Sequence, residues 1–181
     1  MIKSVIVMMP DHDTVAGEQL KLQLYNPWQT GLAISEITGL GPESASINTT
    51  DLATADGSVY NSARMMDREI SFKLLPIETD SRSVDDGRLL TYKFFGIKQP
   101  VTLMFETDNR YAMISGYVKK NSPSIFSKRE TLSISVACPD PYFYEASYND
   151  ITGRVVEAIT ETVFGGVDPM FEYPFSNEDT S

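Results

Sequence analysis

The stretch Leu132-Ser-Ile-Ser-Val-Ala-Cys138 alternates apolar residues with small ones. A period of two places one set of side chains in a core and the other toward water or a partner, so the stretch predicts a β-strand. The same alternation occurs in residues 20–24, Leu-Lys-Leu-Gln-Leu, and in residues 70–74, Ile-Ser-Phe-Lys-Leu. These three segments predict a mainly β protein.

Two further apolar runs, residues 101–106 and 111–118, are separated by Thr107-Asp-Asn-Arg110. Asp and Asn tolerate positive φ, so this spacing predicts a β-hairpin. Residues 1–8 and 31–37 are expected to form additional strands. The fold class expected from these patterns is an antiparallel, β-sandwich-like domain.

Residues 84–95 break the alternation and are expected to form one helix packed on the sheet. Ser83 suits the N-cap and Asp86 the N3 position, while acidic residues in the first turn complement the helix dipole. Gly96 is expected to end the helix in the left-handed conformation. Residues spaced by three and four predict an apolar stripe toward the sheet: Leu89, Leu90, Tyr92, Phe94 and Phe95.

The chain has 181 residues, a formal net charge of -10, 41% hydrophobic residues and 22% charged residues. This composition excludes a disordered chain and a basic nucleic-acid-binding domain. Residues 139–181 carry 9 acids against the single base Arg154, whereas residues 1–138 are nearly balanced. We therefore expect a domain of residues 1–145 and an acidic C-terminal extension of residues 146–181, with the change at Cys138-Pro-Asp-Pro141.

The sequence offers little for catalysis or cofactor binding. His12, the only histidine, cannot build a transition-metal site alone, and Cys138 is in phase with core positions. The sequence contains no Gly-x-Ser-x-Gly elbow, phosphate-binding loop, dinucleotide-binding turn or His-Glu-x-x-His helix. We expect no enzyme, metal or cofactor. The N-terminal residues suggest no signal peptide, and the apolar runs are too short for a membrane span, so synthesis in the cytoplasm is expected.

Residues 39–69 are rich in Ser, Thr, Asn, Ala and Gly and show no regular core face. Roughly thirty residues of this kind are too many for an ordinary connection in a compact domain. Asp56-Gly57 is a strong hairpin-turn signal. The segment is either a surface excursion or a projecting arm whose sparse apolar residues are buried by a neighbouring subunit.

Several stretches, in this order, resemble the distal tail proteins of long-tailed siphophages, a tail-component family. Two of them are Arg68-Glu-Ile-Ser-Phe72 and Cys138-Pro-Asp-Pro-Tyr-Phe143. No single stretch is specific, but their order is kept over most of the chain. The resembling residues are 37–48, 55–64, 68–72, 88–95, 108–111, 116–118, 125–128, 138–143 and 171–175.

The resemblance implies a structural role without catalysis. Such proteins have an N-terminal β domain with one helix and a projecting β-hairpin arm, and they assemble as a hexameric ring at the virion tail tip. The ring would join the tail-tube protein to the tip or baseplate hub and its receptor-binding proteins, and DNA would pass through without specific binding. The implied arm is about residues 47–66, with interface residues Ile47, Leu52, Asp56, Gly57, Val59, Tyr60 and Arg64.

The resemblance has one departure. Many members continue beyond Phe171-Glu-Tyr-Pro-Phe175 into a second, lectin-like β domain, for which the residues from Ala146 onward are too few. Residues 146–181 would then be a short natural ending or the start of a truncated second domain. Two alternative functions are a tail-tube subunit and a glycan-binding β-sandwich module. The latter would use the obvious aromatic residues Trp28, Tyr142, Phe143 and Tyr144.

Overall fold

A computed structural model describes residues 1–9, 18–52, 56–125, 129–149 and 154–162. For residues 147–149 and 154–162 it describes the backbone alone. His12 lies outside the described residues. Within the described part, no helix is long and apolar enough to cross a membrane.

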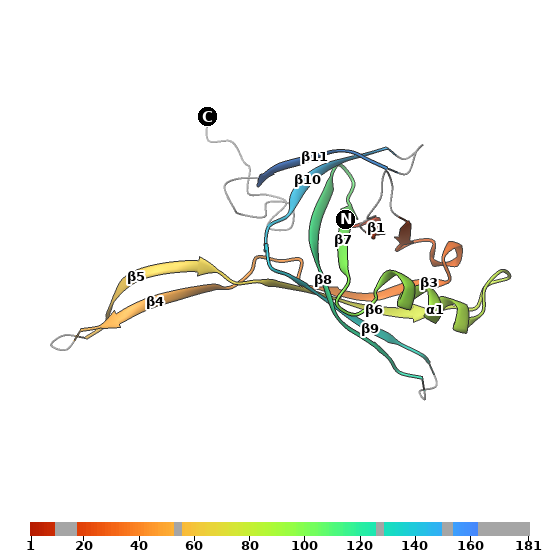
Figure 1. The fold of residues 1–181 in the computed structure, drawn as a ribbon, viewed down its shortest axis with the longest axis horizontal. Coiled ribbons are helices and arrows are strands. Elements are labelled where there is room, and N and C mark those ends of the chain that lie inside the picture. The colour runs from red at the N-terminus through yellow and green to blue at the C-terminus, as the bar shows by residue number, and fades with distance from the viewer. Residues whose placement is uncertain (10–17, 53–55, 126–128, 150–153, 163–181) are drawn as a thin grey trace.

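The body is one antiparallel sheet in which the strand order is β2-β1-β7-β8-β9-β6-β3 (Figure 1). β8 is long: its first half pairs with β7 and β10, and its second half pairs with β9. The sheet therefore turns along β8, and its two halves face each other as in a β-sandwich. The strands are β1 Ser4–Met8, β2 Gln19–Gln23, β3 Leu32–Thr38, β6 Arg68–Pro76, β7 Pro100–Glu106, β8 Tyr111–Pro123, β9 Leu132–Cys138, β10 Tyr144–Asn149 and β11 Arg154–Thr162.

Aromatic side chains join the two halves of the sheet across the core. Phe72 of β6 stacks on Phe105 of β7 with ring centroids 6.4 Å apart, and Phe143 meets Phe105 edge-on at 5.8 Å. Phe95, just after the helix, packs against Phe72 at 6.1 Å. Such pairs stabilise beyond the area they bury.

The structure confirms the predicted alternation. The alternating apolar residues of the three segments are buried: Leu20, Leu22, Ile70, Phe72, Leu74, Leu132, Ile134, Val136 and Cys138. Leu24 lies just outside β2 and is half-buried. The predicted N-terminal strands are present as β1 and β3, and the mainly β fold with one helix is as expected. A short 3-10 turn, η1 Pro27–Gln29, links β2 to β3.

The predicted hairpin between β7 and β8 is present, but the reason given for its turn is wrong. Among the described non-glycine residues only Lys98 has a positive φ, 68°, so Asp108 and Asn109 do not use that conformation. Thr107 closes the turn instead. Its backbone N–H donates to the Arg110 carbonyl at 2.9 Å, and its Oγ1 accepts from the Arg110 N–H at 3.2 Å.

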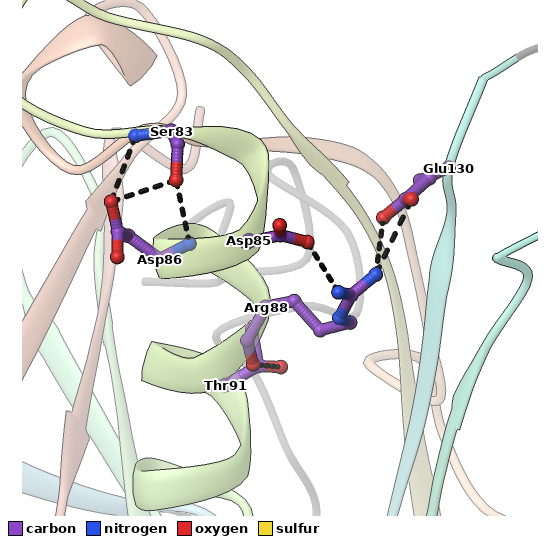
Figure 2. Close-up of polar contacts among 6 residues, drawn as sticks. All are labelled: Ser83, Asp85, Asp86, Arg88, Thr91 and Glu130. Atoms are coloured by element: carbon purple, nitrogen blue, oxygen red, sulfur yellow. Dashed lines mark hydrogen bonds and ion pairs between the residues drawn. The ribbon is translucent and has the colours of Figure 1, made fainter.

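The helix, α1 Val84–Phe94, begins as predicted (Figure 2). The Asp86 N–H donates to Ser83 Oγ at 3.2 Å, and the Ser83 N–H donates to Asp86 Oδ2 at 3.0 Å, which completes a capping box. Arg88 bonds to Asp85 on the helix and lies 3.1 Å from Glu130, which ties α1 to the segment before β9.

The predicted apolar stripe and helix end are partly wrong. Gly87, Thr91 and Phe94 face the sheet, whereas Leu89 and Tyr92 are exposed to 60% and 40%. The helix is thus rotated about its axis relative to the prediction. Gly87 explains this rotation, because a Cβ there would lie 3.3 Å from Pro76 and 3.4 Å from the Gly31 carbonyl. The smallest residue thus allows the closest approach of the helix.

The helix also ends without a left-handed glycine, because Gly96 has no positive φ. The Phe95 N–H donates to the Thr91 carbonyl at 2.8 Å. Asn121 of β8 donates to the carbonyls of Thr91 and Phe95 at 3.3 and 3.1 Å. A side chain from the sheet therefore binds the carbonyls that a capping glycine motif satisfies in other helices.

β10 adds to the edge of β8, where Tyr144 pairs with Met113 and Ala146 with Tyr111. Ala146 is buried beside Ile6 and Met104 on the side of the sheet away from the main core. The chain therefore continues from β9 into a strand that belongs to the same sheet. The division into residues 1–145 and 146–181 stays a prediction.

Candidate subunit interface

A second, two-stranded sheet projects from the body (Figure 1). It consists of β4 Ala45–Asp51 and β5 Ser58–Met65, paired antiparallel from Ala45 with Met65 to Asp51 with Ser58. We call this hairpin the arm. It begins two residues before the predicted range of 47–66 and ends one residue before the end of that range.

The far end of the arm is closed by a glycine. Gly57 has a φ of 101°, a conformation that glycine adopts without strain, and its carbonyl accepts from the Leu52 N–H at 3.3 Å. Between these residues, 53–55 lie outside the described part of the chain. Asp56-Gly57 therefore lies where the hairpin turns.

A bulge sits in the middle of the arm. Asn48 pairs with Ser62 and Thr49 with Tyr60, so Asn61 is the extra residue on β5. A bulge bends a strand and increases its twist. The Asn61 amide donates to Thr50 Oγ1 at 2.7 Å, which fixes the extra residue across the hairpin.

The strand register divides the arm into two faces, because cross-strand partners lie on the same side of a sheet. Ile47 pairs with Ala63 and Thr49 with Tyr60. We call this side the apolar face; it comprises Ile47, Tyr60, Ala63 and Met65, together with Thr49 and Asp51. The other side is the polar face; it comprises Ser46, Asn48, Thr50, Asn61, Ser62 and Arg64, with Val59 as its apolar member.

Neither face is covered by the rest of the described chain. Ile47 is 62% exposed and Tyr60 63%, while Val59 and Leu52 are about half exposed. An isolated two-stranded hairpin is marginally stable in water and needs packing against other elements. Exposed apolar side chains grouped on one face mark interaction sites. The arm therefore presents apolar side chains that no other described part of the chain covers.

The base of the arm is fixed by a buried arginine. Arg68, the first residue of β6 after the arm returns, is 1% exposed. Its Nε donates to the Pro141 carbonyl at 2.6 Å, and one terminal nitrogen donates to the carbonyls of Gly39 and Gly41 at 2.8 and 2.7 Å. Only a guanidinium presents several donors in a rigid fork of this kind.

The charge of Arg68 is also matched. Glu43 lies 3.9 Å from its guanidinium, and the ring of Phe143 lies below it with the centroid 4.7 Å away. A buried cation without such partners would be strongly unfavourable. One side chain thus joins the strand that enters the arm, the strand that leaves it and the segment between β9 and β10.

Gly39 allows these segments to meet. Its φ is 86°, and a Cβ built on it would lie 2.0 Å from the Glu69 carbonyl oxygen. The backbone therefore passes β6 at a distance that no side chain permits. A little further along, the Met66 N–H donates to the Ser44 carbonyl at 3.1 Å and closes the base of the arm.

The predicted interface residues all lie on the arm and are exposed, but they do not share one side. Ile47 and Tyr60 are on the apolar face, whereas Val59 and Arg64 are on the polar face. Sequence reasoning missed Arg68 as the anchor. Its period-two phase with Ile70 places it on the core side of β6, and that phase is the signal that could have revealed it.

Within the described residues, no group of three or more His, Cys, Asp or Glu residues could hold a metal ion. Burial raises the pKa of Cys138 to about 11, so its thiol stays protonated at neutral pH. Burial by itself would raise the pKa of Glu106. Hydrogen bonds from Ser4 and Lys21 outweigh this effect, so the pKa of Glu106 is lower than its usual value.

Two of the four aromatic residues suggested for a glycan platform serve other contacts. Phe143 is buried in the core beside Phe105. The Tyr144 hydroxyl donates to Asp140 at 2.6 Å, and this bond raises the Tyr144 pKa to about 12. Trp28 is exposed in η1.

No family model matches the sequence, and no curated protein matches it. The fold is similar to that of the SPP1 Dit protein, described as a paradigm of the hub adsorption apparatus in phages that infect Gram-positive bacteria. The TM-score is 0.55 at 16% identity, over 79% of this chain and 52% of that one.

The fold is also similar to a chain of the phage P2 baseplate in its activated conformation with Ca. This match has a TM-score of 0.53 at 14% identity, over 93% of this chain and 56% of that one. The match to the same baseplate with Sr has a TM-score of 0.52 at 13% identity, over 93% of this chain and 59% of that one. The chain thus spans little more than half the length of these proteins, and the likeness shows the fold.

We predict that Arg68→Met lowers the free energy of unfolding by about 2–4 kcal/mol, because buried carbonyls lose their donors. Arg64→Met is the matched control: it removes an exposed arginine of the arm and should change stability by less than about 0.5 kcal/mol. Urea unfolding of both variants measures the difference. Equal losses in the two variants would show that Arg68 does not anchor the arm.

We predict that Gly39→Ala lowers the free energy of unfolding by about 2 kcal/mol or more, because it combines a positive φ with a clash against β6. Gly41→Ala should change it by less than about 0.5 kcal/mol, since a Cβ at Gly41 meets nothing within 4 Å. Thermal unfolding followed by circular dichroism compares them. A Gly39→Ala protein as stable as Gly41→Ala would contradict the close approach.

Proposed function

We propose that this chain is a structural subunit of a bacteriophage tail tip or baseplate hub. In this role it has no catalytic activity and no cofactor. Two findings support the proposal together: the fold is similar to that of phage hub and baseplate proteins, and the arm exposes apolar side chains to solvent. The observation that carries it is the arm, whose apolar face has no partner within the described part of its own chain.

The proposed assembly is a hexameric ring at the virion tail tip. The arm of each subunit contacts the next subunit, so donor and acceptor are different surfaces of the same chain. Head-to-tail contacts of this kind generate rings when the rotation closes. The ring joins the tail-tube protein to receptor-binding proteins of the tip, and its channel lets DNA pass without specific binding.

The alternative, a tail-tube subunit, would also form a ring of β-rich subunits. The similarity to a hub protein and a baseplate favours the tip. The glycan-binding alternative has no supporting observation, since Phe143 is in the core and Tyr144 is bonded to Asp140. We therefore retain the hub as the proposed function.

We predict that the full chain self-associates into a ring at high protein concentration and that deleting the arm prevents this. Residues 45–65 can be replaced by an Asn-Gly turn, because Ser44 and Met66 are already hydrogen-bonded across the base. Sedimentation velocity and electron microscopy measure the assembly. The control is Leu89→Ala, which removes an exposed apolar side chain outside the arm.

Antibody labelling along purified tails separates the hub from the tube. One labelled position at the tip is expected for a hub subunit, and label along the whole tail would identify a tube subunit. A chain that stays monomeric at all concentrations and is absent from the tail tip would contradict the proposed function.

A further inference from the structure

The arm needs an acceptor, and a head-to-tail ring requires the acceptor to lie elsewhere on the same chain. An arm that bound the arm of its partner would instead close a two-fold dimer. The acceptor must therefore be an uncovered apolar hollow of the body. The described residues contain a few hollows, and their linings differ.

One hollow has a mainly aliphatic wall. It has a volume of about 550 Å³ and lies where β3, β6 and the start of α1 meet. We call it the groove; its wall is formed by Ala33, Leu75, Pro76, Ile77 and Val84, with Arg129 and Glu130 at the rim. All five wall residues are half-buried, so their apolar surface is only partly covered.

The other hollows suit an apolar face less well. One beside β2 is lined by Lys3, Lys21 and Glu106 among other polar residues. Another, on the outer side of α1, sets Leu89 and Leu90 among Arg82, Asp86 and Lys93. A third, along β2 and α1, includes several glutamines. The groove therefore has the wall that best matches the apolar face of the arm.

The β3 and β6 residues that line the groove come from the end of the β3–β6 ladder that is remote from the arm, and Figure 1 shows the arm extending from the other end of these strands. The β3–β6 ladder runs from Leu32 paired with Pro76, beside the groove, to Thr38 paired with Ser71, beside the base of the arm. Donor and acceptor on opposite ends of a protomer let one contact repeat from subunit to subunit. This is the arrangement that a heterologous ring needs.

Charge agrees with this pairing. Asp51 lies on the apolar face, on the same side of β4 as Ile47. Arg129 is an exposed basic residue at the rim of the groove, and Glu130 beside it is bonded to Arg88. The docking face and the rim thus carry residues of opposite charge, which favours a defined register.

We propose that the apolar face of the arm, through Ile47 and Tyr60, docks into the groove of a second copy of this chain. This assignment rests on the proposed ring and names its contact. Tyr60 and Ile47 supply an aromatic and an aliphatic anchor, and Ile77 and Val84 form the wall that receives them. The groove volume lies in the range of pockets that enclose a ligand, so it can take these side chains.

Cysteine cross-linking of the full chain tests the contact. Tyr60→Cys protein is mixed with Ile77→Cys protein at high concentration and treated with a short bismaleimide. A covalent dimer is expected, because each variant supplies one half of the contact. Ser62→Cys is the matched control, since Ser62 lies on the polar face and should cross-link poorly to the same partner. The native Cys138 is buried and does not compete.

Substitution gives a second readout. Ile77→Lys should weaken self-association by about 30-fold or more, the effect of losing a central contact, whereas Leu89→Lys should change it by less than about threefold. Unfolding curves of both variants establish that the body stays folded, which is expected because both residues are partly or fully exposed.

The possible results distinguish a failure of the assigned groove from a failure of the proposed ring. Cross-linking through residue 60 and not residue 62, with loss of association in Ile77→Lys, supports the contact. If ring formation depends on the arm but Ile77→Lys does not weaken self-association, the groove is not the acceptor. The proposed function would still stand. Equal cross-linking from both faces also overturns the groove assignment. A full chain that neither associates nor labels the tail tip overturns both proposals.

Discussion

The guanidinium of Arg68 is the contact on which the placement of the arm depends. It lies in the core, and its charge is acceptable there only because backbone carbonyls, Glu43 and the ring of Phe143 surround it. These groups come from segments far apart in the sequence. The direction of the arm, the path of the chain at Gly39 and the start of the last strand pair are therefore fixed by one side chain.

A firm base is needed because the arm cannot supply its own stability. Within the described part of the chain its two strands have no second layer, and the apolar residues Ile47 and Tyr60 face solvent. Burying them on a second copy would provide the missing apolar contact. A flexible base would add the entropic cost of orienting the whole arm at each binding event. In the proposed assembly, the buried anchor at Arg68 and the uncovered arm would therefore act together.

Most of the fold follows from patterns that are local in the sequence. Alternation in residues 132–138 and 70–74 locates strands, and Ser83 with Asp86 locates the start of the helix. Asp56-Gly57 and the lack of a core face in residues 39–69 locate the arm. These patterns succeed because each depends on neighbours within a few residues.

The features that sequence reasoning missed depend on contacts between distant segments. The rotation of the helix, which exposes Leu89, is set by the approach of Gly87 to Pro76. Gly96 is not needed as a cap because Asn121 bonds to the last carbonyls. The two faces of the arm depend on a bulge at Asn61, which shifts the register and cannot be placed from composition.

Hydrogen exchange of the backbone amides tests most directly whether the arm is held at its base and completed by a partner. In the dilute, monomeric chain we expect amides of β4 and β5 to exchange rapidly, while those of Ile70 and Phe72 in β6 stay protected. On assembly, protection should rise along the arm and change little in the core of the body. Arm amides protected as strongly as those of β6 in the dilute monomer would contradict the account.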